Sequence, residues 1–196
     1  MSRAHFLTWR DRNELPKTGL SEAQRDKEGR TMMDREKLLN EIFESALLSE
    51  MKYFGWAQSV LAGLQEKIGI ISQDVFKADS VLGEGVVGKK ETCGALISAI
   101  MAIGSFLGSE SLADVEQNEK VMESAVRVYN RFKEKVGHTL CDEIQKIRYG
   151  KAYHLSIPEE RLAFQEMGGY SRKGCPEVCG IAAQVAAEVI LDIKES

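Results

Sequence analysis

The sequence predicts an all-α protein, a single-domain bundle of five to seven helices with an extended N-terminal arm. The 196 residues include only three prolines and are rich in Ala, Leu, Glu and Lys, which favour helices. Apolar residues recur at helical spacing along most of the chain, and no segment alternates with the period of a strand. A chain of this length can also bury a core of its own.

Residues 1–33 are expected to form the arm. They mix charges of both signs with Pro16, Gly19 and Gly29, and they show no sustained period. Such a segment is either a flexible tail or a strap laid over a partner subunit. The second interpretation makes a homodimer held through the arm reasonable, and residues 34–196 then form the helical domain.

The first helical pattern starts at Asp34. Its apolar stripe continues to Ile68, with Gly55 as an expected bend. Residues 72–82 predict a short helix, and "GEGVVGKK" after it predicts a loop because of its three glycines. The stripe opens with five residues at helical spacing: Leu39, Ile42, Phe43, Ala46 and Leu47.

The segment "ETCGALISAIMAIGSFLG" is apolar nearly all round, which predicts a central buried helix with Thr92 as a candidate N-cap. An amphipathic helix over residues 112–136 follows, and Gly137 is suited to end it.

Three more helices complete the prediction. "HTLCDEIQKI" is expected to start at the N-cap Thr139, and "SIPEERLAFQEMGG" has Pro158 in its first turn. The last helix is expected over residues 176–193.

Composition excludes several classes of protein. The net charge of −4 and the lack of a basic stripe argue against nucleic-acid binding. No apolar run approaches the ~20 residues that cross a bilayer, and the first residues do not resemble a secretory signal. We therefore expect a cytoplasmic protein without membrane contact.

In the cytoplasm four cysteines are more often ligands or redox groups than disulfides, although free cysteines can also be plain core residues.

The cysteines share a position relative to the predicted helices. Cys93 and Cys141 follow candidate capping threonines, Cys175 directly precedes Pro176, and Cys179 lies one turn further along the same face. Unpaired N–H groups and the helix dipole at a helix start favour thiolate over thiol. Thiolate is the form that binds metals and attacks disulfides, so this placement predicts a functional thiol cluster.

Three segments resemble the C_GCAxxG_C_C family of redox-active proteins. "ETCGA" is intact at residues 91–95, Cys141 stands in "LCDEI", and Cys175-Pro176 opens the last helix. The resemblance extends from about Leu38 to Ile193. The thiol arrangement is also similar to the non-haem part of split-Soret cytochromes c, which carries a cysteine-ligated iron–sulfur cluster. No Cys-x-x-Cys-His is present, so covalent haem is not expected.

Three positions depart from the family pattern. Trp56 stands where the family usually has its first cysteine, Ser98 replaces a glycine, and Cys179 is additional. One interpretation is that a four-ligand site is retained with altered geometry. The other is that the site has decayed and Cys179 is incidental.

The site predicted from these observations consists of Cys93, Cys141, Cys175 and Cys179. Four cysteines can hold a [2Fe–2S] or [4Fe–4S] cluster or a zinc ion, and their spacing does not choose between iron and zinc. The resemblance implies redox use, hence a cluster for electron transfer with a partner protein that is not identified. Thiol–disulfide chemistry at Cys175 and Cys179 is the first alternative. A helical interaction module with structural zinc or a decayed site is the second.

Five further residues are candidates for supporting roles. His138 could join a metal site, and Lys89, Lys90 and Lys173 could lower thiol pKa values or screen an anionic cluster. Trp56 could close the site from water. Each also has an ordinary explanation as a loop or core residue. No hydrolase motif is present.

Overall fold

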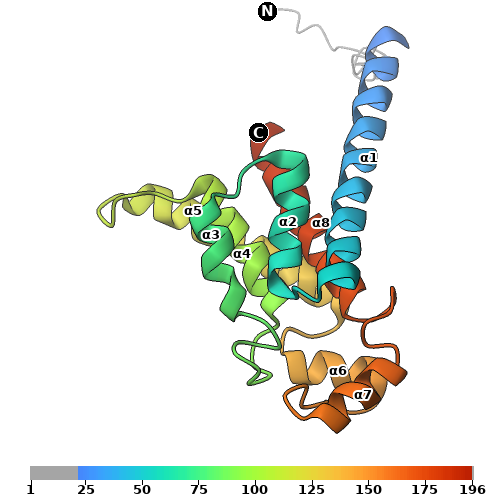
Figure 1. The fold of residues 1–196 in the computed structure, drawn as a ribbon. Coiled ribbons are helices and arrows are strands. Elements are labelled where there is room, and N and C mark those ends of the chain that lie inside the picture. Colours follow the sequence, from blue (N-terminus) through green and yellow to red (C-terminus); the bar gives the residue numbers. More distant parts are fainter. Residues whose placement is uncertain (1–21, 196) are drawn as a thin grey trace, which may run out of the picture. The chain divides into compact units, whose positions relative to one another are not determined.

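The computed structural model describes residues 22–195 of the chain (Figure 1). The chain divides between Glu36 and Lys37 into two units, and α1 contributes to both. The helices are α1 (Glu22–Tyr53), α2 (Ala57–Ile68), α3 (Gln73–Ala78), the 3₁₀ turn η2 (Asp79–Val81), α4 (Gly94–Leu107), α5 (Val115–Val136), α6 (Cys141–Tyr149), α7 (Pro158–Glu166) and α8 (Cys175–Glu195).

The all-α prediction is confirmed for the described residues, whose only β pairing is an isolated antiparallel bridge between Thr92 and Leu140. The described residues contain eight α-helices where five to seven were expected. The helix expected to bend at Gly55 is instead broken into α1 and α2, because Phe54 and Trp56 adopt positive φ angles of 52° and 39°.

The first helix also starts earlier than Asp34. Residues 22–33 of the expected arm belong to α1, while residues 1–21 lie outside the described residues. The proposed role of the arm in a homodimer therefore stays a prediction.

Helix α4 is central in the second unit, as its nearly uniform apolarity predicts. It packs against α2, α5 and α8, and Leu96, Ala99 and Ile103 on it are fully buried. The Lys37–Tyr53 part of α1 adds Ile42 and Ala46 to the same core. No helix in the described part of the chain has the length and apolarity needed to span a bilayer.

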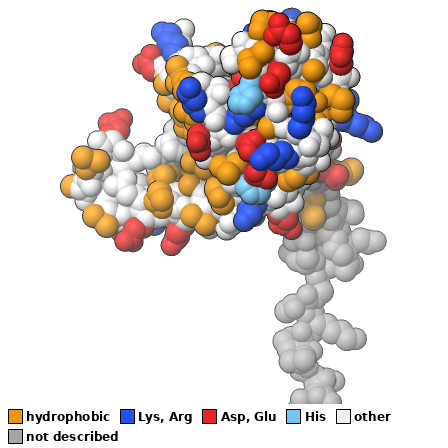
Figure 2. All heavy atoms as spheres, turned by 90° about the horizontal axis from the view of Figure 1, so that it is seen from below, with side chains coloured by type: hydrophobic (Ala, Val, Ile, Leu, Met, Phe, Trp, Pro, Cys, Tyr) orange, Lys and Arg blue, Asp and Glu red, His pale blue; other side chains and the backbone are white. Residues whose placement is uncertain are grey.

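A smaller core lies around α6 and α7, at the end of the bundle where α4 and α8 begin (Figure 1). Phe164 is fully buried and meets Tyr149 and Tyr170 edge-on, with ring centroids 5.2 and 5.0 Å apart. On the face seen from this end, acidic and basic side chains are interspersed (Figure 2). The site is built between this smaller core and the helix starts.

Candidate functional site

The helix starts carry the cysteines as predicted. Cys93 is the N-cap of α4, while Cys141 and Cys175 are the first residues of α6 and α8. The expected capping residues are wrong by one position, because Cys93 takes the place assigned to Thr92 and Leu140 the place assigned to Thr139.

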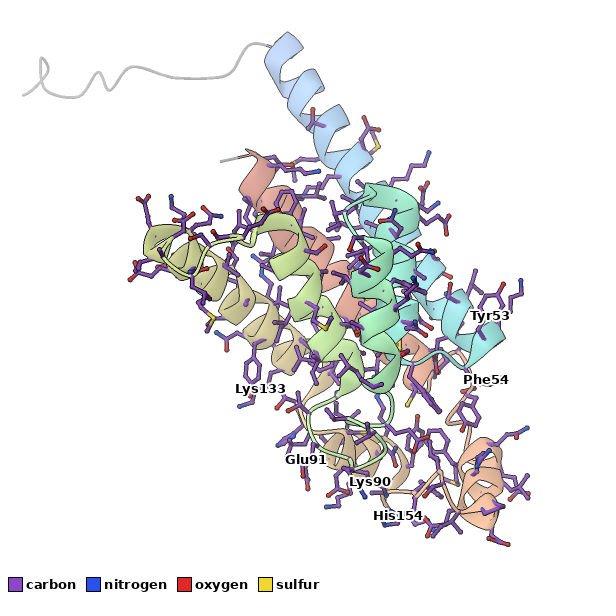
Figure 3. All side chains as sticks on the ribbon, turned by 60° about the vertical axis from the view of Figure 1, so that its left-hand side comes forward. Tyr53, Phe54, Lys90, Glu91, Lys133 and His154 are labelled. Carbon is purple, nitrogen blue, oxygen red and sulfur yellow. The ribbon has the colours of Figure 1, made fainter. Side chains whose placement is uncertain are left out.

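Backbone pairing brings Cys93 and Cys141 together although 48 positions separate them in sequence. The Cys93 N–H donates to the Thr139 carbonyl oxygen (2.8 Å), and the Cys141 N–H donates to the Glu91 carbonyl oxygen (2.8 Å). Glu91 lies in the loop before α4, next to Lys90 (Figure 3). These bonds flank the isolated bridge, so the starts of α4 and α6 are held side by side.

Arg148 links α6 to the start of α8. Its Nη1 donates to the Lys173 carbonyl oxygen and to Glu177 Oε2, each at 2.8 Å. The Cys175 N–H in turn donates to the Gly169 carbonyl oxygen (2.9 Å). The third cysteine-bearing helix is thereby fixed to the same end of the bundle.

Two glycines permit the close approach of these segments. A Cβ on Gly94 would lie 2.1 Å from the Leu82 carbonyl oxygen, so the glycine of "ETCGA" lets the preceding loop pack on the first turn of α4. Gly85 has a φ of +70°, and a Cβ there would lie 2.7 Å from Cys141 Cβ. Side chains at either position would separate the loop from the thiols.

All four cysteines line one small cavity of about 40 Å³. Cys93, Cys141 and Cys175 are half-buried, Cys179 is buried, and all four are free thiols. Trp56 lines the same cavity, so the residue that the resemblance places at the position of a cysteine lies at this site. The volume is sufficient for a water molecule or a single ion.

The sulfur atoms of Cys179 and Cys141 take part in hydrogen bonds with other residues of the cavity wall. The Cys179 thiol donates to the Trp56 carbonyl oxygen (3.3 Å), which places Cys179 beside Trp56. Gln145 Nε2 donates weakly to Cys141 Sγ (3.8 Å), and Gln145 Oε1 accepts from the Tyr153 N–H (2.7 Å).

The expectation that the helix starts favour thiolate is wrong for this structure. Burial raises the pKa of all four thiols, that of Cys141 to about 12. Backbone N–H groups of Leu96 and Ala95 act in the opposite direction at Cys93, but burial outweighs them. The cysteines are therefore neutral thiols at pH 7, and neutral thiols are poor nucleophiles.

A buried carboxyl group adds to this effect. Glu50 on α1 is fully buried, and burial raises its pKa to about 7. Its Oε2 accepts from Ser59 Oγ (3.0 Å), whereas Oε1 has no hydrogen-bond partner in the described part of the chain. When ionised, Glu50 would further raise the pKa values of Cys179, Cys175 and Cys93.

The donor set suits a thiolate-binding metal, but its arrangement is not that of a ligated site. No three His, Cys, Asp or Glu side chains of the described residues are positioned to hold a metal ion. The four thiols line one cavity from three helices, and they would have to move before they could ligate one ion together. A bound cation would supply the positive charge that buried thiolates lack.

The lysines and the histidine that were expected to assist the cysteines differ in their contacts with the site. Lys90 lowers the pKa of Cys141, as expected, though less than burial raises it. His138 Nδ1 accepts from the Leu140 N–H (3.1 Å), a loop contact, and His138 is not among the residues that line the cavity. Lys173 contributes its carbonyl oxygen to Arg148, and nothing in the described residues ties Lys89 to a thiol.

The sequence prediction missed Glu50, Gln145 and Arg148. Gln145 and Arg148 lie four and seven positions after Cys141, on one face of α6, and this spacing could have identified them. Glu50 lies four positions after Ala46 in the apolar stripe of α1, where a buried acid is unexpected.

Fold and site together define an all-helical protein with four cysteines around one cavity at the starts of three helices. Residues 55–189 match the family described as "Putative redox-active protein (C_GCAxxG_C_C)". The match covers more than half of the chain, so the chain belongs to this family. No curated protein and no solved structure matches it.

Proposed function

We propose that this chain is a cytoplasmic electron-transfer protein that holds an iron–sulfur cluster on Cys93, Cys141, Cys175 and Cys179. One observation carries the proposal: the four thiols line a single cavity, and Cys179 occupies the place beside Trp56. The substitution and the additional cysteine are thus neighbours in space, which supports compensation rather than decay.

The family's description as redox-active favours iron over zinc, because Zn²⁺ has no redox chemistry in proteins. A cluster bound by these residues would supply one-electron exchange. In this proposal the Trp56 side chain, which lines the cavity, closes it from bulk water, and burial keeps the thiols neutral until a cation binds. The cavity of about 40 Å³ is small, so its walls must part to admit a cluster.

Thiol–disulfide chemistry at Cys175 and Cys179 is less well supported. A disulfide-forming pair needs an accessible thiolate, and burial raises the pKa of both thiols well above their usual value. The Cys179 thiol also donates a hydrogen bond to the Trp56 carbonyl oxygen, which favours its neutral form.

The first test is anaerobic purification with a visible spectrum and assays of iron, zinc and acid-labile sulfide on one sample. Brown protein with stoichiometric iron and sulfide, bleached by dithionite, would support the cluster. Colourless protein with one zinc would indicate a structural site. Colourless metal-free protein would contradict the proposal.

Variants then assign the ligands. Cys93→Ser and Cys179→Ser should each lose most of the chromophore, while Ser124→Ala, a small substitution remote from the cavity, should retain it. If Cys179→Ser keeps the full chromophore, Cys179 is incidental. If Cys179 does replace the family's first cysteine, the double variant Trp56→Cys/Cys179→Ser should recover the chromophore.

A further inference from the structure

A second, larger cavity adjoins the cysteine cavity. Its volume is about 380 Å³, within the ~300–1,000 Å³ range of small-molecule sites. The two cavities share three wall residues: Trp56, Glu84 and Leu155. The larger one is therefore immediately outside the thiol site, and the proposed cluster does not use it.

Aromatic side chains form much of its wall. Phe54, Trp56 and Tyr170 line it, and the rings of Phe54 and Tyr170 meet edge-on with centroids 5.0 Å apart. Phe54 is 49% exposed, unusual for a phenylalanine, and lies at the junction of α1 and α2 (Figure 3). Exposed and half-buried rings at a concave surface offer faces on which a flat ring can stack.

Three of the six non-glycine residues with positive φ in the described part of the chain line the same wall. The φ angles of Phe54, Trp56 and Glu84 are 52°, 39° and 55°. Residues other than glycine rarely adopt positive φ angles. Such residues persist only where the surrounding structure holds them, and they cluster at ligand sites.

Arg161 contributes a permanent positive charge to the wall of this cavity. Arg161 Nε donates to the Leu155 carbonyl oxygen (2.8 Å), which orients the guanidinium group, and the charge of Arg161 acts on Glu84 in the same wall. Glu84 is the only acid in the wall, and burial raises its pKa more than the charge of Arg161 lowers it. A guanidinium group is always positively charged, and its N–H donors are spaced to bind two oxygen atoms of one oxyanion.

We infer that this cavity binds a planar aromatic anion, with its ring among Phe54, Trp56 and Tyr170 and its acidic group on Arg161. Gln165 and Ser156, also in the wall, provide further polar contacts. Binding of this ligand does not require the cysteine chemistry proposed above, so either proposal can fail alone.

The probe is anthraquinone-2-sulfonate, which is planar and anionic and has no free ring position that readily adds thiols. The chain has two tryptophans, so Trp9→Phe leaves Trp56 as the only one, and its fluorescence reports on this cavity. We expect saturable quenching, with one site per chain by isothermal titration calorimetry. Hexanesulfonate, an aliphatic anion, should compete at least tenfold more weakly.

Arg161→Gln and Phe54→Ala, each in the Trp9→Phe background, should raise the dissociation constant at least tenfold. Arg172→Gln, which changes a guanidinium group outside the cavity, should leave it unchanged, and Cys93→Ser should bind as tightly as its parent. Circular dichroism checks that each variant is folded. Non-saturable quenching, or equal affinities of folded Arg161→Gln and its parent, would overturn the inference.

Discussion

Ser98 and Asp79 form a buried polar pair between α4 and η2. Ser98 Oγ lies 2.8 Å from Asp79 Oδ1 and 2.9 Å from the Gly94 carbonyl oxygen, but the hydroxyl has only one proton to donate. The Ser98 hydroxyl therefore donates either to Asp79 Oδ1 or to the Gly94 carbonyl oxygen, one at a time. Burial raises the pKa of Asp79 to about 6, although the hydrogen bond from Ser98 acts in the opposite direction.

Ser98→Ala should lower the free energy of unfolding by about 1–3 kcal/mol, because the buried carboxyl group of Asp79 then loses its hydrogen bond from Ser98. Urea denaturation measures the change. Ser124→Ala is the control, since its hydroxyl bonds only to the Lys120 carbonyl oxygen of its own helix (2.8 Å) and should cost less. Equal losses in both variants would show that the pair contributes nothing specific.

Glu50 should make stability depend on pH. Its pKa is raised to about 7 in the folded chain from 4.5, so the folded state binds more protons between these values. Stability contributed by the neutral carboxyl is full below pH 4.5 and is lost as pH rises to about 7, at up to ~1.4 kcal/mol per pH unit.

Glu50→Gln tests this dependence by urea denaturation at several pH values between about 5 and 8. The variant should show a flatter profile and be the more stable protein at the upper end. Asp79 titrates mainly below pH 6 and is present in both proteins, so the difference above that value reports Glu50. Parallel profiles would contradict the assignment.

At the scale of elements, the first turn of α4 depends on the absence of a side chain at Gly94. A Cβ there would lie 2.1 Å from the Leu82 carbonyl oxygen, a backbone atom that cannot move without the loop. Because Cys93 is the adjacent N-cap, displacement of this loop would also displace a thiol.

Gly94→Ala should lower the free energy of unfolding by about 1–3 kcal/mol, as overpacking does. Gly104→Ala in the same helix meets nothing within 4 Å and should instead stabilise by roughly 0.5–1 kcal/mol. Thermal and urea denaturation of both variants check the contrast. A Gly94→Ala protein as stable as Gly104→Ala would refute the close approach.

For the whole molecule, the burial of the thiols predicts their reactivity. The metal-free protein should react slowly with Ellman's reagent at pH 8, because burial raises all four thiol pKa values and the cavity of about 40 Å³ excludes the reagent. In guanidinium chloride all four cysteines should react at once. Rapid labelling of the folded protein at two cysteines would favour the dithiol alternative.

Local patterns were enough to predict the all-α class and the placement of three cysteines at helix starts. Period and glycine placement predicted the order of the helices, and Cys93, Cys141 and Cys175 were correctly assigned to helix starts. The break at Phe54–Trp56 was expected only as a bend, because positive φ at these residues is imposed by packing rather than by residue type.

The sequence by itself thus determined the fold class and which residues could form a site, since both depend on neighbours within a few positions. The tertiary structure decided the rest. It joined segments far apart in the chain through the Arg148 contacts and the backbone bonds of Cys93 and Cys141. It also reversed the expected thiol pKa shift, because burial depends on the whole fold and here outweighs the effect of a helix start.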